Sequence, residues 1–195
     1  MPANILRIFP IFLLLACAVL QGCETVNMRA PVASEHNVAV IRTAKLGPVS
    51  LGQFHVDRRK FGKDGRITLR GEYLGSPYEG SFGEFLRESI KTELAAAGIY
   101  RVSADTVLTA TLSESHLEVG GFGPGSGSLK GRFIVTSKGV VVYDREIGLS
   151  ETWESSFGAA VAVPRAVEKY ENFYQKMVME LFNDPRFRDA LRARP

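Results

Sequence analysis

The chain has little cysteine and little histidine, and these shortages exclude several kinds of site. Only two of its 195 residues are cysteines, Cys17 and Cys23. Both lie near the N-terminus, so the rest of the chain can form neither a disulfide nor a thiolate metal site. The three histidines, His36, His55 and His116, lie far apart and match no zinc-motif spacing. We therefore expect no metal and no cofactor, and a fold that rests on its hydrophobic core.

Sequence motifs for catalysis or nucleotide binding are also missing. No Gly-x-Ser-x-Gly motif precedes a predicted helix, and the glycine-rich segment 120–128 lacks the Gly-Lys-Ser/Thr end of a phosphate-binding loop. Glu151 and Glu154 lie close together, as the carboxylates of an acid–base pair do, but such pairs are common at solvated strand ends. We expect that the protein is not an enzyme.

Neither sign of charge is in large excess. Lys and Arg number 24, against 21 Asp and Glu, and a nucleic-acid-binding protein would concentrate positive charge on one face. No nucleic-acid partner is therefore expected. One local cluster, Arg58, Arg59, Lys60 and Lys63, is a candidate contact with a partner or with anionic lipid head groups. A solvated hairpin tip is the simpler interpretation of this cluster.

Only one long apolar run is present, and as a helix it would be too short to span a membrane. It covers residues 8–20 and follows Arg7, the first charged residue. A helix of this length would extend about 20 Å, against a hydrocarbon core about 30 Å thick. A positive residue before such a run is typical of a secretory signal. The next residues, Leu20-Gln21-Gly22-Cys23, resemble the lipobox of bacterial lipoproteins.

The resemblance to a lipobox implies that residues 1–22 are a signal peptide and that Cys23 is lipidated. The thiol would carry a diacylglycerol, the new amino group would be acylated, and two or three acyl chains would anchor the protein firmly. A plain secretory signal with a chance cysteine is the alternative. Glu24 rather than Asp follows the cysteine, and the same resemblance then favours the outer membrane, with the domain facing the periplasm.

The rest of the chain predicts a tether and one domain. Removal of 22 of the 195 residues leaves 173, enough for one ordinary domain. The polar residues 23–37 predict a lipidated, flexible tether, and residues 38–195 predict a single periplasmic domain. Residues 38–41 are apolar and predict a first, central strand. Residues 57–74 predict a hairpin with residues 63–65 at its tip.

Two long amphipathic helices are predicted. Ser81 and Glu84 form a capping-box sequence before the first helix, and Gly98 suits the left-handed position after it. Apolar residues recur at helical spacing over 163–181, with Pro164 near the start. Strands are predicted over residues 49–56, 107–119, 129–136 and 140–153. This order predicts an α+β fold, with a mostly antiparallel sheet and both helices packed on one of its faces.

Residues 120–128 predict a flexible loop between two strands because they are rich in glycine. Phe122 lies at the apex of this loop. We therefore treat Phe122 as a candidate contact with a partner or with the membrane.

A short set of motifs accompanies the predicted elements. They are the lipobox, the end of the capped helix at residues 94–100 (LAAAGIY), and residues 153–157 (WESSF) before the last helix. With the order of elements over roughly residues 80–182, these motifs resemble the YajG-like family of small envelope lipoproteins. The resemblance implies a periplasm-facing lipoprotein with no catalytic residues to carry over. A looser likeness connects the chain to auxiliary lipoproteins of envelope lipid transporters.

Two functions are open at this point. The first is a non-enzymatic accessory or interaction module, bound to the membrane through Cys23 and to an unidentified envelope protein. The second is an auxiliary component of an envelope lipid or lipopolysaccharide transport system, which would hold lipid in a groove between sheet and helices.

Overall fold

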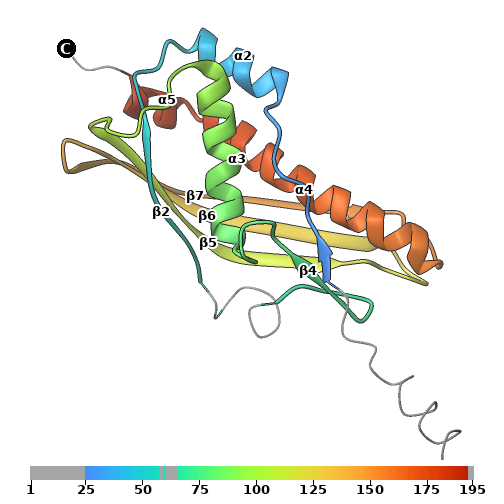
Figure 1. Ribbon diagram of the computed structural model, residues 1–195. Helices are drawn as coiled ribbons and strands as arrows, with labels where there is room; N and C mark the ends of the chain where they lie inside the picture. Colours follow the sequence, from blue (N-terminus) through green and yellow to red (C-terminus); the bar gives the residue numbers. More distant parts are fainter. Residues whose placement is uncertain (1–24, 58, 60–65, 193–195) are drawn as a thin grey trace, which may run out of the picture.

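A four-stranded sheet forms the centre of the protein. The computed structural model describes residues 25–57, 59 and 66–192. The strands of the sheet are β2 (Ser50–Val56), β5 (Thr106–Glu118), β6 (Gly125–Ser137) and β7 (Val140–Trp153). They lie in the order β2-β5-β6-β7, with β2 parallel to β5 and the other pairs antiparallel. Helices α3 (Phe82–Ala97) and α4 (Ala159–Asn183) cover one face (Figure 1). The predicted α+β fold is confirmed.

Helix α3 begins and ends where the sequence predicts. The Ser81 side chain accepts a hydrogen bond from the backbone N–H of Glu84 at 3.1 Å, and so satisfies one of the free donors of the first turn. At the other end, Gly98 has a φ of 83°, a left-handed conformation that costs glycine little. The helix lies between the parallel strands β2 and β5 in the chain and provides the crossover that such a pair requires.

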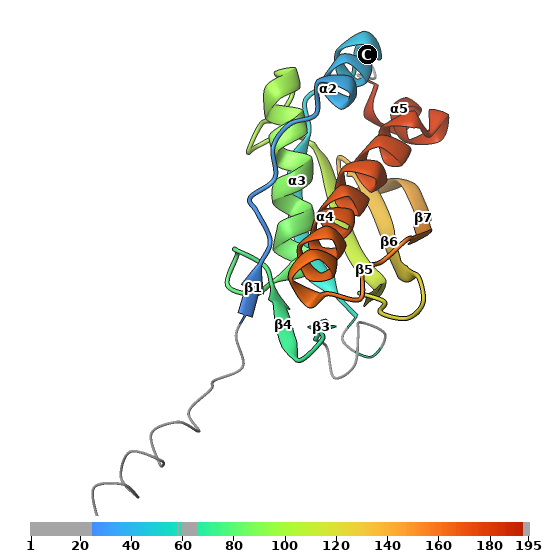
Figure 2. The ribbon, with the colours of Figure 1, turned by 90° about the vertical axis from the view of Figure 1, so that its right-hand side faces the viewer.

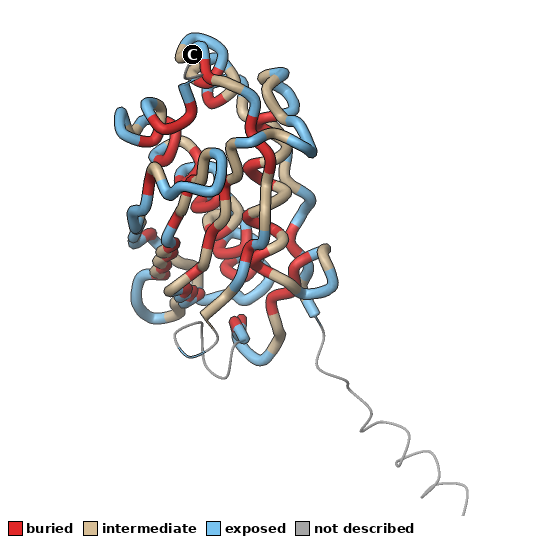
Figure 3. Tube along the Cα trace, turned by 90° about the vertical axis from the view of Figure 1, so that its left-hand side faces the viewer, coloured by how far each residue is buried: buried red, intermediate tan, exposed pale blue. Residues whose placement is uncertain are grey.

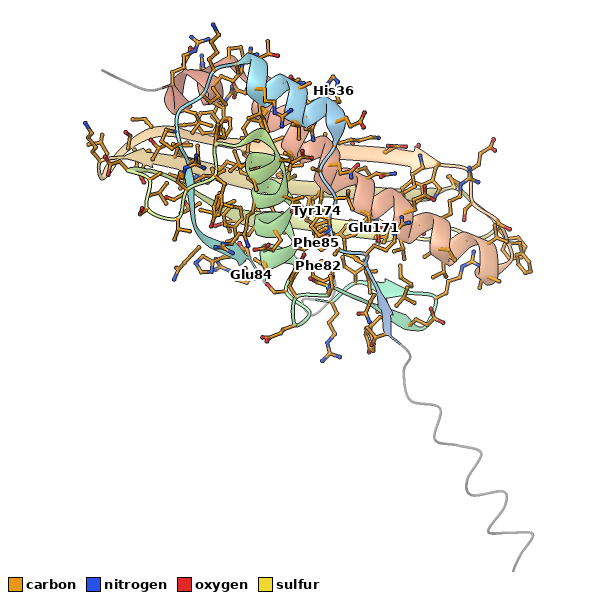
Figure 4. All side chains as sticks on the ribbon, turned by 45° about the horizontal axis from the view of Figure 1, so that its top comes forward. His36, Phe82, Glu84, Phe85, Glu171 and Tyr174 are labelled. Carbon is orange, nitrogen blue, oxygen red and sulfur yellow. The ribbon has the colours of Figure 1, made fainter. Side chains whose placement is uncertain are left out.

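Aromatic rings fill the space between the sheet and the two helices. Tyr170, Phe173 and Tyr174 of α4 are each at most 1% exposed. Tyr174 packs edge-on against Phe85 of α3, with ring centroids 4.7 Å apart, and Figure 4 shows these two rings between the helices. The Tyr170 hydroxyl lies 2.6 Å from the hydroxyl of Ser115 on β5, so its buried oxygen has a partner. Among the described residues, aromatic side chains therefore pack this interface.

The N-terminal part of the domain differs from the predicted tether. β1 (Thr25–Asn27) pairs in parallel with β4 (Glu72–Gly75), and the next residue, Met28, is only 3% exposed. The prediction of a flexible tether over residues 23–37 is therefore wrong from residue 25 onward. The polar composition misled it, because the contacts that fix this segment come from residues far away in the sequence.

Residues 38–41 are helical, so the predicted first strand is wrong. They lie in α2 (Glu35–Thr43), which begins at Ser34, whose hydroxyl accepts from the backbone N–H of Asn37. Asn37 and Ile41, four residues apart, are the buried side chains of this helix. A short apolar run fits one turn of a buried helix as well as a strand, and its periodicity alone cannot distinguish them.

A second, small sheet lies at one end of the large one (Figure 2). Its order is β1-β4-β3, where β3 (Thr68–Leu69) and β4 form a hairpin with Arg70 and Gly71 in the turn. Both turn residues have positive φ, 50° and 101°, as a two-residue hairpin turn of the primed type requires. The hairpin predicted over residues 57–74 is thus wrong in its return strand, because residues 68–75 fold back on themselves as β3 and β4. Its predicted tip, residues 63–65, lies outside the described residues.

Residues 125–128 belong to strand β6, so the prediction of a loop over 120–128 is wrong in its second half. A Cβ atom on Gly125 would lie 2.4 Å from the Trp153 indole nitrogen, and one on Gly127 would lie 2.5 Å from the Phe173 ring. Neither distance is sterically allowed in a close-packed interior. Glycine is needed at these two positions to make room for aromatic rings, and flexibility is not its role here.

The C-terminal helix α5 (Pro185–Leu191) is attached through Asp184. The Asp184 carboxylate accepts hydrogen bonds from the backbone N–H of Arg186 at 2.9 Å, from the Tyr143 hydroxyl at 2.9 Å and from the Arg145 guanidinium at 3.0 Å. Burial would raise the pKa of Asp184, but these hydrogen bonds and the arginine charge outweigh it and hold the pKa below its ordinary value. The residue therefore joins β7, α4 and α5 as an ionised carboxylate.

Figure 3 shows buried segments running through the middle of the domain, with exposed segments at the connections. Within the described part of the chain, the helices are too short or too polar to cross a membrane.

Candidate functional site

Two chain segments at one end of the large sheet are held together by Arg70. Residues 119–124 join β5 to β6, residues 155–158 lead from β7 into α4, and together they form what we name the tip. The Arg70 guanidinium, from the β3–β4 turn, donates hydrogen bonds to the Gly120 carbonyl and to the Phe157 carbonyl, the latter at 2.7 Å. One cation thus bridges both segments through charge-assisted hydrogen bonds, which are stronger than neutral ones.

Further hydrogen bonds hold the two segments side by side. Arg70 Nη2 also donates to the Ser156 carbonyl at 3.1 Å. The Ser155 hydroxyl donates to the carbonyl of Val119 at 2.5 Å, which links the segments directly. Carbonyl groups that a loop would otherwise leave to water are therefore used to fix the shape of the tip.

Two phenylalanines lie on the outer surface of the tip. Phe122 is 99% exposed and Phe157 is 71% exposed. Their rings contact each other, with centroids 5.0 Å apart and an angle of 51° between the planes. Single exposed apolar residues are common on protein surfaces, whereas contiguous apolar groups indicate an interaction site. The structure confirms the exposure of Phe122 that its predicted role requires, while the role itself stays a prediction.

The two segments that carry the aromatic pair have no charged side chains of their own. Residues 119–129 and 155–164 contain no Asp, Glu, Lys or Arg. In the first turn of α4, Val161 is 60% exposed. Charged residues resume next to the tip at Glu118 and Glu154. The tip thus combines two uncharged segments with the Arg70 guanidinium that joins them, and charged residues border it.

The predicted basic contacts lie only partly within the described chain. The side chain of Arg59 is 92% exposed and is 3.4 Å from the carboxylate of Asp57. Arg58, Lys60 and Lys63 lie outside the described residues. An exposed ion pair of this kind contributes little to stability, so Arg59 can exchange Asp57 for another anion. Contact of these four basic residues with a partner or a membrane stays a prediction.

A groove of about 830 Å³ separates α2 from α5 and the end of α4. It lies at the end of the molecule opposite β1 (Figures 1 and 2). Its lining combines small apolar groups such as Ala39 and Val40 with the basic residues Lys45, Arg188 and Arg192. The Nε atom of Arg188 is buried and has no hydrogen-bond partner among the described residues.

The fold of the chain is similar to that of several solved structures. No family model matches the chain, and no curated protein matches it significantly. Protein XCC0632 from Xanthomonas campestris, described with family-model DUF330, is similar over 85% of this chain and 95% of its own, with a TM-score of 0.55 and 15% identity. The fold is shared with a DUF330 protein.

Two further solved structures are similar to a lesser degree. An uncharacterised protein has a TM-score of 0.49 and 13% identity, over 82% of this chain and 99% of its own. The hypothetical protein CT253 from Chlamydia trachomatis has a TM-score of 0.43 and 12% identity, over 70% of this chain and 96% of its own. At such identities a structural match shows the fold alone, so membership of the YajG-like family stays an expectation from the sequence.

Histidines and paired carboxylates do not converge on a catalytic arrangement within the described residues. His36 lies on α2 (Figure 4), His55 contacts Gln53 on its own strand β2, and His116 is 4.0 Å from Glu118 on β5. Among the residues that the structure describes, no three His, Cys, Asp or Glu side chains are grouped so as to hold a metal ion.

Glu151, the other candidate from the sequence, is an ion-pair residue. Its carboxylate accepts hydrogen bonds from the ammonium groups of Lys169 at 2.7 Å and of Lys176 at 2.5 Å. These hydrogen bonds hold the pKa of Glu151 below its ordinary value. A general acid requires the opposite shift, so this environment favours a structural role that joins β7 to α4.

The sequence reasoning missed Arg70, Phe157 and the buried carboxylate of Glu93. The signal for Glu93 was present, because this residue lies three and seven positions after Ile90 and Leu86 on the apolar stripe of α3. Arg70 and Phe157 carried no local signal. Their role in the tip depends on the hydrogen bond from Arg70 to the Phe157 carbonyl, which joins residues 87 positions apart in the sequence.

Proposed function

We propose that the protein is a lipid-anchored lipoprotein of the cell envelope that faces the periplasm and acts, without catalysing a reaction, as an accessory or interaction module. The observation that carries this proposal is the position of β1. This strand begins at Thr25, two residues after Cys23. Because consecutive Cα atoms are about 3.8 Å apart, a lipid on Cys23 would be attached within about 8 Å of the folded domain.

The segment after β1 is fastened to both long helices, so an anchor at Cys23 would be connected to the folded domain and not to a loose tether. The backbone N–H of Arg29 donates to one oxygen of Glu171 on α4 at 2.7 Å, and its guanidinium donates to the other at 2.7 and 3.0 Å. Farther on, the backbone N–H of Ser34 and the side-chain amide of Asn37 both donate to Glu93 on α3. A module held in this way is joined to the membrane at its β1 end, without a long flexible linker.

The groove between α2 and α5 is the surface that we propose for an envelope protein partner. It lies at the end farthest from β1, and its lining includes Lys45, Arg188 and Arg192. These charges favour an acidic segment of the partner. Membership of the YajG-like family and location in the outer membrane belong to the same proposal.

The anchor is tested by the intact mass of the protein isolated from envelopes. We expect a chain that begins at Cys23 and carries a diacyl or triacyl adduct. Cys23→Ser should abolish the adduct and the cleavage, whereas Cys17→Ser should leave both unchanged, because Cys17 would leave with the signal. An unmodified native chain would refute the proposal.

The partner surface is tested by photocrosslinking in intact envelopes. A photoreactive group at Lys45 in the groove should capture one defined envelope protein, and the same group at Lys138, in the β6–β7 turn, should not. In a chain with the crosslinker at Ala39, Lys45→Glu should lower the yield several-fold, because it places a negative charge against an acidic partner. Equal capture from positions 45 and 138, or no protein at all, would contradict this assignment.

The alternative from the sequence, an auxiliary role in lipid or lipopolysaccharide transport, required a groove between sheet and helices. In the described residues that space is filled by Tyr170, Phe173 and Tyr174. Phospholipid retained in defined ratio by the purified protein, without a protein partner, would favour the alternative over our proposal.

A further inference from the structure

The start of β1 lies beside the hairpin turn that holds the tip together. β4 leaves this turn at Glu72, and β1 runs parallel to β4 with Thr25 opposite Tyr73. Neighbouring strands are about 4.8 Å apart, so Thr25 lies one strand spacing from the second residue after the turn. Arg70 in the same turn donates to carbonyls of both tip segments. Figure 2 shows β1, the small sheet and the start of α4 at one end of the molecule.

A lipid on Cys23 would keep this end of the molecule against the membrane. The two-residue reach of about 8 Å is much shorter than the domain. Strand β6 has 13 residues, and at about 3.3 Å per residue it places the β6–β7 turn roughly 40 Å from the tip. The tip therefore lies much nearer to the anchor than the β6–β7 turn does.

The chemistry of the tip fits a lipid surface. Phe122 and Phe157 are 99% and 71% exposed, and their rings contact each other on the outer surface of the tip. Charged side chains are costly below the head groups, and residues 119–129 and 155–164 contain none. Aromatic side chains are enriched at membrane–water interfaces, where apolar groups become buried beside polar lipid head groups.

We infer that the tip inserts into the bilayer beside the lipid anchor, with Phe122 and Phe157 among the lipid head groups and upper acyl chains. This inference rests on the proposed lipidation of Cys23. Arg70 acts as a positioning residue, because it fixes the backbone of both segments and so keeps the two rings on the surface. The domain thus has a second point of membrane contact, which prevents it from rotating about its lipid.

The inference is tested with the lipidated chain in vesicles of phosphatidylethanolamine and phosphatidylglycerol that contain brominated acyl chains. A fluorescent probe is attached to a thiol introduced by Gly123→Cys, where a Cβ atom would meet no other atom within 4 Å, so both phenylalanines are retained. The control is the same probe at Val140→Cys, a 65% exposed site at the far end of β6. We expect quenching by the brominated lipid to be several-fold stronger at position 123 than at position 140.

A matched variant separates insertion from mere proximity. Phe122→Ser combined with Phe157→Ser, in the chain labelled at position 123, should lower the quenching several-fold while leaving thermal unfolding unchanged, because both rings are exposed. Quenching unaffected by this double substitution would overturn the insertion of the rings.

The mass of the same sample distinguishes failure of the tip from failure of the anchor. A lipidated chain that is quenched equally weakly at positions 123 and 140 would overturn the inference and leave the proposed anchor intact. A chain without the adduct would overturn the proposed function and, with it, the inference that depends on it.

Discussion

At the scale of single residues, Glu93 is a carboxylate buried in the interior face of α3, with 2% of its surface exposed. One oxygen accepts hydrogen bonds from the Ser34 N–H at 3.0 Å and from the Asn37 amide at 3.1 Å, and the other has no partner among the described residues. Burial raises the pKa of Glu93 above its ordinary value of 4.5, and the two hydrogen bonds oppose this effect without cancelling it. The residue fastens the N-terminal segment at an energetic cost.

This cost should appear as a pH dependence of stability. The unfolded carboxyl group ionises near pH 4.5, whereas the folded one stays protonated to a higher pH, so the free energy of unfolding should fall between these two pKa values and then level off. Glu93→Gln should remove this fall, as measured by urea unfolding from pH 4 to 8. Glu180→Gln, an exposed position on α4, should retain it. Equal slopes for wild type and Glu93→Gln would show that folding does not raise the pKa of Glu93.

At the scale of the element, strand β6 depends on glycine at positions where its neighbours bring large rings. Gly127 lies against Phe173 of α4, which is 1% exposed and cannot move aside freely. Gly123, four residues earlier, has no atom within 4 Å of where its Cβ would be. The same residue type therefore has different roles within one glycine-rich stretch.

A pair of alanine substitutions should distinguish these roles. Gly127→Ala should lower the free energy of unfolding by about 1–3 kcal/mol, because the new methyl group overpacks a buried interface. Gly123→Ala should change it by less than about 0.5 kcal/mol, as for an ordinary surface position. Denaturant unfolding of both variants provides the measurement. If Gly127→Ala is neutral, this part of β6 is not closely packed against α4.

At the scale of the whole molecule, the N-terminal segment is part of the folded domain. Met28 is buried, Arg29 pairs with Glu171, and Ser34 caps α2. The side chain of Arg29 is 76% exposed, so the ion pair itself adds little stability. Burial of apolar surface is the larger contribution of this segment.

Truncation should reveal this contribution. A chain that begins at Glu35 should be less stable than one that begins at Thr25 by at least about 2 kcal/mol, because it loses Met28 from the core and the Ser34 cap. The chain that begins at Thr25 serves as the control, since it lacks only residues 1–24 and keeps β1. Equal midpoints in urea for both chains would restore the interpretation of residues 25–34 as a flexible tether.

The amino-acid sequence by itself determined the elements whose signals are local. Helix α3 is specified between Ser81 and Gly98, because its capping residues and apolar stripe all lie within one stretch of chain. The apolar stripe of α4 and the hairpin of β6 and β7 are likewise predicted, and from these the α+β fold follows. The exposure of Phe122 could also be predicted, since an aromatic residue flanked by glycines has few neighbours of its own.

Only the tertiary structure decided the features that depend on residues distant in sequence. The helical state of residues 38–41, the pairing of β1 with β4 and the strand conformation of Gly127 are each set by contacts from elsewhere in the fold. The same holds for the tip, where Arg70 joins segments that lie 50 and 87 residues away. Composition indicates that a segment is polar or rich in glycine, but the burial and hydrogen bonds that fix its conformation exist only once the chain has folded.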